Sequence, residues 1–580
     1  MANDCKWKDT EIQVERNSKR EIEKEGGGIL KNVEPNVKDY EEFCKKFKWE
    51  IPEYYNFGFD TIDDWAEKEP DKVALITVSN DGENAQRHTF KDLKILSNKF
   101  ANVLRKYGIK KGDRVFIMLP RVPEWYVAVL GCIKIGAVFM PTPTLCTAKD
   151  VKYRITRAEA VMAITNAEFA ERVDEVDDEC PSLKYKVIIG GEKEGWISYE
   201  KEMEEAQETL TNVERTKTSD PLLIYFTSGT ESYPKMVLHT HSYALAHWVT
   251  AYVVQDLKPE DTQWVLADTG WAKTAWGKLF GQWLIGATIV QWNAKGRFNP
   301  EVALKIIERY GVTVFCAPPT AYRMMIQVKD LKKYNFSKLR HCLSAGEPLN
   351  PEVIRVWKDA TGVDIYDYYG QTETVALVGN LRCMPIKQGS MGKPTPGHYV
   401  AIVDDDGNEL PTGEEGHIAV KITPVRPPGL MKEYWKDEES NKKAFKGDWY
   451  YTGDRAYKDE DGYLWFVGRA DDVIKSSGYR IGPFEVESAL QEHPAVVESA
   501  VVGVPDPIRG AVVKAYVILA EGYEPSEELT KELQEHVKRI TAPYKYPRII
   551  EYVNELPKTL SGKIRRSELR KREMSKLEKR

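Results

Sequence analysis

A run of hydroxyl residues, glycine and lysine follows a strand-like apolar segment near the middle of the chain. The segment Pro221–Phe226 (PLLIYF) leads directly into this run. Its residues are Thr227, Ser228, Gly229, Thr230 and Lys235. Backbone amides and hydroxyls can donate hydrogen bonds to phosphate oxygens, and a lysine adds positive charge. The run therefore predicts a loop that holds a polyphosphate, with a plain surface turn as the alternative.

The spacing from Gly229 to Lys235 matches that of the G-x-x-x-x-G-K-[ST] phosphate loop, but two positions do not. Pro234 stands where that loop has its second glycine, and Met236 stands where it has the magnesium-binding hydroxyl. The run therefore does not qualify as that loop.

The run resembles instead the phosphate-binding signature of the adenylate-forming superfamily. That group includes acyl-CoA synthetases, luciferases and the adenylation domains of peptide synthetases. The sequence departs at Glu231 and Ser232, where the family commonly has Thr-Gly or Ser-Gly. An acidic side chain near phosphate is unfavourable unless it points away or meets magnesium.

Four further signatures follow in the order of the family, and the resemblance covers the chain from about residue 54 to 566. Two of them imply an ATP site on the adenine and α-phosphate sides. Their ATP-binding residues are Gly346, Glu347, Pro348, Asp367, Tyr368, Tyr369, Gly370, Gln371 and Thr372. An aromatic ring of this set can stack on adenine, and Thr372 can bond the α-phosphate. Glu373 resembles the magnesium ligand of the family, because a hard carboxylate suits a hard cation. A strand end with ordinary core tyrosines is the alternative.

The signature around Asp454 resembles the motif whose aspartate grips the ribose hydroxyls, a role that suits a bidentate acceptor. Gly468–Asp472 resembles the end of the large domain, with Arg469 on the nucleotide and Asp471 as the hinge. A surface ion pair is the alternative for Arg469 and Asp471.

Beyond this hinge, the resemblance implies a small domain with two working faces. Ser477 and Gly478 fall on the face that lines the pantetheine tunnel for thioester formation, and Arg480 follows as an ATP-binding residue. Lys563 falls on the lysine that serves adenylation, where a fixed cation stabilises the charge that moves between carboxylate, phosphate and pyrophosphate. The catalytic set is therefore Lys563, Thr227, Lys235 and Glu373.

The segment Trp264–Pro300 contains five tryptophans and several glycines, a mixture that can wall an apolar acyl pocket. The expected pocket residues are Trp271, Trp276, Gly370 and His239, and core packing is the alternative for each tryptophan. The stretches DTGWAKTAW and LPRVPEWY resemble the medium-chain acyl-CoA synthetase branch.

Two absences bear on the acid. No Asp or Glu lies between Thr269 and Pro300, which disfavours an amino-acid substrate. Acetyl-CoA synthetases place a tryptophan where this chain has Gly370, so we expect space for a medium or branched aliphatic chain there.

The composition fits a large protein without nucleic-acid partners. The chain has 580 residues, 42% hydrophobic and 30% charged, and a net charge of −6. Eight scattered cysteines without metal-ligand spacing, and an N-terminus without an apolar signal segment, favour a cytoplasmic location. No segment is apolar enough to predict a membrane span.

Apolar runs alternate with helical periodicity from Asp71 to about Ile402, which predicts βαβ units and a mostly parallel sheet. Strand-like runs with Asp-Gly turns then predict an antiparallel, barrel-like portion. We expect three parts: residues 1–53 as a charged, partly disordered arm, 54–470 as a large α/β adenylation domain, and 471–580 as a small mobile α+β domain.

The sequence thus predicts an AMP-forming acyl-CoA synthetase that uses ATP, Mg²⁺, coenzyme A and a carboxylic acid. A luciferase-like or aryl-acid ligase, and a catalytically inactive binding module, are the alternatives. The oligomeric state is left open between monomer and homo-oligomer.

Overall fold

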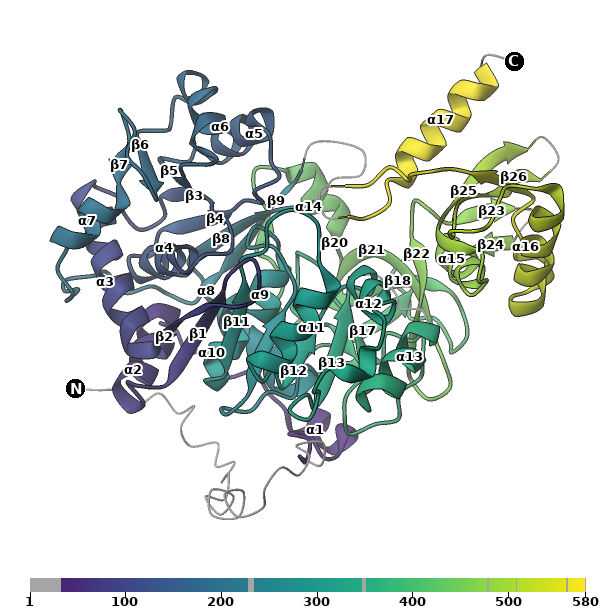
Figure 1. The fold of residues 1–580 in the computed structure, drawn as a ribbon, viewed down its shortest axis with the longest axis horizontal. Coiled ribbons are helices and arrows are strands. Elements are labelled where there is room, and N and C mark those ends of the chain that lie inside the picture. The colour runs from purple at the N-terminus through teal and green to yellow at the C-terminus, as the bar shows by residue number, and fades with distance from the viewer. Residues whose placement is uncertain are drawn as a thin grey trace.

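The computed structural model describes residues 33–227, 234–346, 351–476, 479–506, 509–559 and 562–578. Two large sheets, a curled antiparallel sheet and a small C-terminal domain build the molecule (Figure 1). The expected α/β class with an antiparallel portion and a small α+β domain is confirmed.

The first large sheet has nine strands in the order β16-β15-β14-β13-β12-β10-β11-β1-β2. They are β1 (Val73–Val78), β2 (Ala85–Thr89), β10 (Thr262–Val265), β11 (Thr288–Trp292), β12 (Val314–Cys316), β13 (His341–Ala345), β14 (Ile365–Tyr369), β15 (Val378–Gly379) and β16 (Lys393–Pro394). The run from β1 through β11, β10, β12 and β13 to β14 is parallel. Because parallel neighbours point the same way, the carboxyl ends of β13 and β14 meet at one edge.

The second large sheet has eight strands in the order β19-β9-β8-β4-β3-β5-β6-β7. They are β3 (Arg114–Met118), β4 (Val138–Pro141), β5 (Met162–Asn166), β6 (Tyr185–Ile189), β7 (Ile197–Ser198), β8 (Pro221–Phe226), β9 (Met236–Thr240) and β19 (Glu433–Tyr434). The antiparallel pair β8 and β9 flanks the phosphate loop, and β19 pairs with β9 on its far side.

The curled third sheet is antiparallel and comprises β17 (Val400–Val403), β18 (Gly416–Lys421), β20 (Phe445–Lys446), β21 (Trp449–Lys458) and β22 (Leu464–Arg469). It confirms the hairpins predicted from the Asp-Gly turns.

Helices cover both faces of the large sheets (Figure 1). They are α1 (Tyr40–Lys46), α2 (Asp64–Lys68), α3 (Phe90–Lys106), α4 (Pro123–Lys134), α5 (Ala148–Ala158), α6 (Ala170–Asp174), α7 (Tyr199–Glu205), α8 (His241–Trp248), α9 (Lys273–Gly277), α10 (Phe280–Ile285), α11 (Pro300–Arg309), α12 (Pro319–Ile326), α13 (Pro351–Thr361) and α14 (Glu438–Ala444), with short η helices between some of them. Several begin at residues that satisfy their free amides: Thr89 and Asp92 form a capping box at α3.

The largest core cluster packs α3, α4, α8 and α10 with strands of the two large sheets, and a second cluster packs α11, α12 and α13 on the first sheet. The most apolar stretch of the sequence is the buried helix α4 followed by β4, not a membrane span. Among the described residues, no helix combines the length and apolar character needed to cross a membrane.

The small domain contains β23 (Ile474–Ser476) paired with β24 (Tyr479–Ile481), and a sheet of β25 (Val496–Asp506), β26 (Gly510–Leu519) and β27 (Ile549–Tyr552). Its helices are α15 (Pro483–Gln491), α16 (Glu527–Ile540) and α17 (Arg566–Glu578). Phe484 of α15 contacts Phe466 of β22, with ring centroids 6.4 Å apart.

The described part of the N-terminal segment is tied to the large domain. The Tyr40 hydroxyl donates to the Pro394 carbonyl at 2.8 Å, and Trp49 Nε1 donates to the Gly397 carbonyl at 2.9 Å. The boundaries drawn at residues 53/54 and 470/471 stay predictions.

Candidate active site

The loop after β14 joins two parts of the predicted site. At its start, the Tyr369 hydroxyl and Gln371 Nε2 donate to Asp454 Oδ2 at 2.6 and 2.7 Å. Near its end, Glu373 Oε1 accepts from the Tyr434 hydroxyl at 2.7 Å, and Tyr434 belongs to the strand that pairs with β9. Residues 369–373 therefore connect the expected ribose side with the expected phosphate side.

The described ends of the phosphate loop are held together by two hydrogen bonds. The Thr227 amide donates to the Lys235 carbonyl at 3.0 Å, and the Lys235 amide donates to Thr227 Oγ1 at 3.2 Å. Lys235 Nζ lies 4.8 Å from the centroid of the Tyr434 ring. The remaining loop residues predicted to bind ATP, Ser228, Gly229 and Thr230, lie outside the described residues.

Glu373 is buried, at 8% exposure, and its carboxylate has one described partner, the Tyr434 hydroxyl. The second carboxylate oxygen is therefore free of hydrogen bonds to described residues. Mg²⁺ is commonly bound by one or two protein carboxylates together with substrate phosphates, so Glu373 fits that role. The described residues hold no cluster of three or more His, Cys, Asp or Glu side chains that would bind a metal without the substrate.

Thr372 is half-buried, and its carbonyl accepts from His239 Nε2 at 2.7 Å. Complete burial lowers the pKa of His239 to about 3, so the imidazole is neutral near pH 7. The ring stacks on Tyr243 with centroids 3.7 Å apart. His239 thus supports the backbone of the loop after β14 at Thr372.

Asp454 sits deep in the expected ribose site while its partner Arg469 reaches solvent. Asp454 is 4% exposed, and its Oδ1 accepts from Arg469 Nη1 at 3.2 Å. The carboxylate raises the pKa of Arg469, although solvent screens the half-exposed guanidinium. Arg469 therefore pairs with the predicted ribose acceptor and not with Asp471, which is exposed.

On the expected adenine side, Gly346 ends β13 in a left-handed conformation with φ of +99°. A Cβ atom there would lie 3.1 Å from Lys273 Nζ, which donates to the Ala345 carbonyl. Burial raises the pKa of Asp367 to about 8. The other two residues predicted for this turn, Glu347 and Pro348, lie outside the described residues.

The two adjacent tyrosines have different surroundings. Tyr368 is 3% exposed, its ring lies 5.8 Å from that of Trp276, and its hydroxyl lies 3.6 Å from the Cys316 thiol. Tyr369 is half-buried and bonds Asp454. Core packing, the alternative for these tyrosines, thus describes the surroundings of Tyr368, whereas Tyr369 contacts the carboxylate of the expected ribose site.

The space expected beside Gly370 is filled. A Cβ atom on Gly370 would lie 2.2 Å from Trp276 Cη2 and 2.6 Å from the Val375 carbonyl oxygen. The indole of Trp276, itself 5% exposed, occupies the place that a side chain at position 370 would take. The missing side chain at Gly370 therefore makes room for the indole of Trp276 and does not by itself lengthen the pocket.

The five tryptophans of the pocket segment divide into two groups. Trp264 and Trp292 pack in the core cluster of α11 to α13, and Trp283 packs against Phe90. Core packing is therefore correct for these three. Trp271 is half-buried beside α9, and Trp276 faces Gly370, so these two remain at the expected pocket.

The small-domain residues are only partly described. Lys563 is exposed, and its amide donates to Thr559 Oγ1 at 3.1 Å within a hairpin closed by a bridge between Lys558 and Ile564. Arg480 lies in β24, opposite Lys475. Ser477 and Gly478 lie outside the described residues.

The structure shows an anchored residue next to the predicted hinge. Asp472 accepts a hydrogen bond from Arg570, and Arg566 Nη1 lies 3.8 Å from its carboxylate. Arg566 also donates to the buried Glu487 at 2.6 Å. Asp472, the residue after the predicted hinge, is thus tied to α17. This helix begins at Arg566, three residues after Lys563. Spacing along the chain gave no signal for these contacts.

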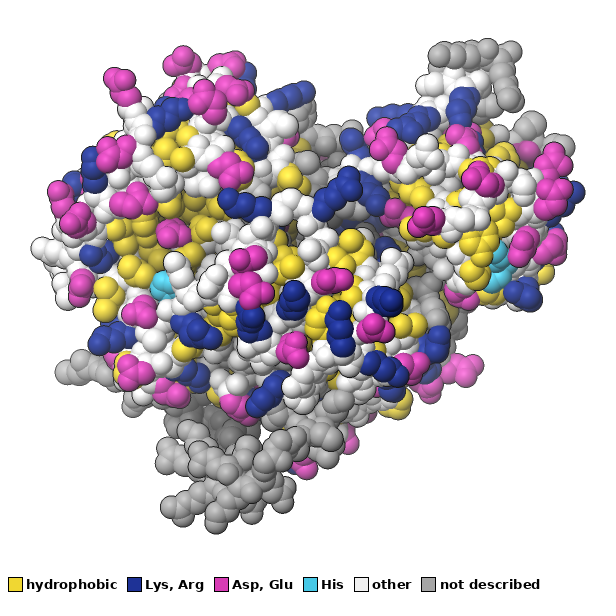
Figure 2. All heavy atoms as spheres, in the orientation of Figure 1, with side chains coloured by type: hydrophobic (Ala, Val, Ile, Leu, Met, Phe, Trp, Pro, Cys, Tyr) yellow, Lys and Arg dark blue, Asp and Glu magenta, His cyan; other side chains and the backbone are white. Residues whose placement is uncertain are grey.

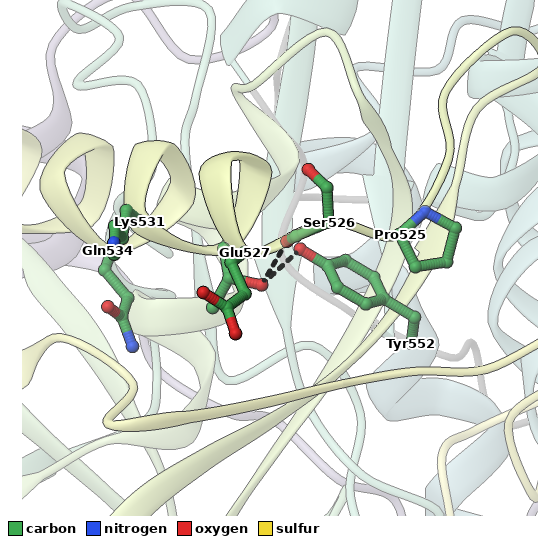
Figure 3. Close-up of a pocket in the computed structure, with 7 residues that line it drawn as sticks. Pro525, Ser526, Glu527, Lys531, Gln534 and Tyr552 are labelled. Carbon is green, nitrogen blue, oxygen red and sulfur yellow. Dashed lines mark hydrogen bonds between the residues drawn. The ribbon is translucent and has the colours of Figure 1, made fainter.

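Lys and Arg side chains gather on the surface between the large and small domains (Figure 2). A pocket of about 420 Å³ lies elsewhere, at the start of α16 (Figure 3). There the Thr530 hydroxyl lies 2.9 Å from that of Tyr552 and donates to the Ser526 carbonyl at 2.8 Å. It contains none of the predicted site residues, so it is not the candidate site.

Comparison with known proteins agrees with this geometry. Residues 62–435 match the AMP-binding enzyme family, and residues 485–563 match the AMP-binding enzyme C-terminal domain. The chain is 48% identical over 548 residues to the human acyl-coenzyme A synthetase ACSM3, mitochondrial, covering 93% of each.

Two solved structures are similar over most of the chain. The anthranilate CoA ligase AuaEII in complex with anthranoyl-AMP has a TM-score of 0.84 at 33% identity, covering 91% of this chain and 99% of the ligase. An acyl-CoA synthetase from Brucella canis has a TM-score of 0.72 at 36% identity, covering 93% and 100%.

The expected cytoplasmic location is wrong. Curated relatives at 47–48% identity, including the human ACSM3 and ACSM4 synthetases, are named as mitochondrial. Reduced cysteines and the lack of a secretory segment led to that expectation, but neither feature separates the cytoplasm from the interior of a mitochondrion.

Proposed function

The chain belongs to the AMP-binding enzyme family and is an AMP-forming acyl-CoA ligase, and we propose that it activates a medium-chain or branched aliphatic acid in two steps within one site. The observation that carries the proposal is the continuous path from Asp454 through Tyr369, Gln371 and Glu373 to Tyr434 and Lys235. With the roles proposed for Asp454 and Lys235, this path would run from the ribose to the phosphates of one bound nucleotide.

In the first step, a carboxylate oxygen of the acid attacks the α-phosphorus of ATP, and pyrophosphate leaves. Asp454 holds the ribose hydroxyls, and its bonds from Tyr369 and Gln371 fix the direction of its carboxylate. Thr227, Lys235 and Lys563 stabilise negative charge as it moves to the leaving pyrophosphate, because fixed donors need little reorganisation. Thr372 orients the α-phosphate, with His239 holding its carbonyl.

Mg²⁺, when bound with ATP, would neutralise phosphate charge. Glu373 is the residue that would hold it, through the oxygen that Tyr434 leaves free. The neighbouring Tyr434 hydroxyl donates to the carboxylate and so holds it in place.

In the second step, the thiolate of coenzyme A attacks the acyl carbon, and AMP leaves. We propose that the small domain turns about Asp471 between the steps, taking Lys563 out and bringing Ser477 and Gly478 in. The anchored Asp472 would transmit this turn to α17 and its adjoining hairpin.

The acid class follows from the pocket wall. Trp271 and Trp276 offer apolar surface, and no Asp or Glu of the segment 269–300 could pair with an ammonium group. A neutral aliphatic tail is therefore preferred over an amino acid. The anthranilate ligase similarity makes an aromatic acid the second candidate. In keeping with its relatives, we propose a mitochondrial location.

The test is pyrophosphate release from MgATP with straight-chain, branched and aromatic acids, each with and without CoA. Turnover that peaks on an aliphatic acid longer than acetate supports the proposal. A peak on benzoate or anthranilate would replace it with the aryl-acid function.

A further inference from the structure

A buried arginine packs against the last residue of the strand that leads into the phosphate loop. Arg154, on α5, is 3% exposed, and its guanidinium carbon lies 4.5 Å from the centroid of the Phe226 ring. Phe226 ends β8 and immediately precedes Thr227. We propose that Arg154 is a positioning residue of the phosphate loop whose charge strengthens the binding of polyphosphate.

The neighbouring residue holds the other end of the loop. The Tyr153 hydroxyl donates to the Pro234 carbonyl at 2.9 Å, and Pro234 immediately precedes Lys235. Two successive residues of α5 thus contact both arms of the loop, one through an aromatic ring and one through a backbone carbonyl. Because Thr227 and Lys235 are hydrogen-bonded to each other, a shift of α5 would move both residues.

No described acid lies within ion-pair distance of the Arg154 guanidinium. Arg154 forms no ion pair within the part of the chain that the structure describes, and its Nε is buried without a hydrogen-bond partner. Asp150, the one acid of α5, accepts from the amide and hydroxyl of Thr147 at 2.9 and 2.8 Å. The buried thiol of Cys146 lies next to the guanidinium, and the Asp150 carboxylate attracts it from beyond ion-pair distance.

Packing on the Phe226 ring does not by itself require a charged side chain at position 154. The other buried residues of α5, among them Val151 and Ile155, are apolar and line the same core cluster as Phe226. A leucine would suit this surface, whereas burying an unpaired guanidinium is costly, and burial lowers the pKa of Arg154. The cost is offset if an anion binds nearby, because the attraction between charges is strong where water is excluded. The polyphosphate expected at Thr227 and Lys235 is such an anion.

This inference rests on the proposed function, since ATP supplies the polyphosphate. The experiment compares Arg154→Leu, Arg154→Lys and the matched control Arg157→Leu, an exposed arginine on the same helix. Full-length variants are assayed for kcat and for KM of MgATP and of the acid. Binding of inorganic pyrophosphate to each variant is measured by calorimetry.

We expect Arg154→Leu to raise KM for MgATP roughly tenfold, equal to about 1.4 kcal/mol, with KM for the acid changed less than about twofold. Pyrophosphate binding should weaken in parallel. Arg154→Lys should keep most of the wild-type KM for MgATP and of the pyrophosphate affinity, because it keeps the charge. Arg157→Leu should match the wild type in both measurements. If Arg154→Leu does not fold, Arg154→Lys is compared with Arg154→Gln instead. The Arg154→Lys variant is then expected to bind pyrophosphate more tightly than the Arg154→Gln variant.

Three results would overturn the inference. The first is an unchanged KM for MgATP in Arg154→Leu, and the second is an equal rise in KM for MgATP and in KM for the acid. The third is an equal loss of pyrophosphate affinity in Arg154→Lys and in the uncharged variant, Arg154→Leu or Arg154→Gln. A wild-type chain without acid-dependent pyrophosphate release would instead reject the proposed function. Calorimetry would still report on Arg154 in that case, so the two failures are distinguishable.

Discussion

Replacing Trp276 by alanine should lengthen the acyl site, because its indole fills the space beside Gly370. Each methylene that becomes buried contributes about 0.8 kcal/mol, or roughly fourfold in affinity. If the vacated ring volume accepts three methylenes, the longer acids gain about 2.4 kcal/mol, or roughly 50-fold in kcat/KM. Since Trp276 is 5% exposed, the same change should cost about 3–5 kcal/mol of folding stability.

The assay is kcat/KM for straight-chain acids of increasing length, with thermal unfolding measured in parallel. Trp264→Ala is the matched control, because Trp264 is 1% exposed but packs in the core cluster of α11 to α13. It should lose comparable stability without any change in preferred chain length. If Trp276→Ala proves too unstable to assay, Trp276→Leu retains some packing and should shift the preference in the same direction.

An unchanged chain-length optimum in a folded Trp276 variant would refute this reasoning. So would an equal shift in the Trp264 control, since the effect would then come from general loosening of the domain. A third refutation would be a Gly370→Ala variant with wild-type kinetics, because its Cβ would lie 2.2 Å from the indole.

Lys563→Ala should abolish adenylation but spare thioester formation from supplied acyl-AMP, and Gly478→Trp should do the reverse; equal loss of both half-reactions in either variant would reject this division of roles. Asp454→Asn should raise KM for ATP roughly tenfold through a weakened ribose contact and reduce discrimination against 2′-deoxy-ATP, measured by competition between the two nucleotides; intact discrimination would contradict the ribose assignment. Three buried histidines should make the fold sensitive to acid. They are His239, His241 and His341, whose burial lowers their pKa values to about 3, 4 and 3. The unfolded chain binds protons near pH 6.5 and the folded chain does not, so this stability is complete above pH 6.5 and is lost as pH falls toward 4. Thermal unfolding at pH 7.5, 6 and 5 should show a falling Tm, and a constant Tm would contradict the prediction.

The strands and the order of the site motifs were predictable because they depend on local patterns. The apolar run Pro221–Phe226 is β8, and the stretch before Gly370 is β14, as the run lengths and turn residues predicted. Parallel pairing then places β13 and β14 side by side, with the residues at their carboxyl ends adjacent.

Contacts between distant residues were not predictable in the same way. Gly370 and Trp276 are far apart in sequence, and only the packing of α9 against the loop after β14 reveals that the indole fills the glycine's space. Tyr434 on Glu373 and Arg570 on Asp472 were missed for the same reason. Periodicity reports which face of an element is buried, but not which partner covers it.

The central claim is that one site makes an acyl adenylate and then a thioester. The most direct measurement is the stoichiometry of products from a saturating aliphatic acid, MgATP and CoA, with acyl-CoA, AMP and pyrophosphate quantified together. Equal amounts of all three are predicted, with pyrophosphate released in a burst when CoA is left out. Formation of ADP and phosphate, or of AMP and pyrophosphate without a thioester, would contradict the claim.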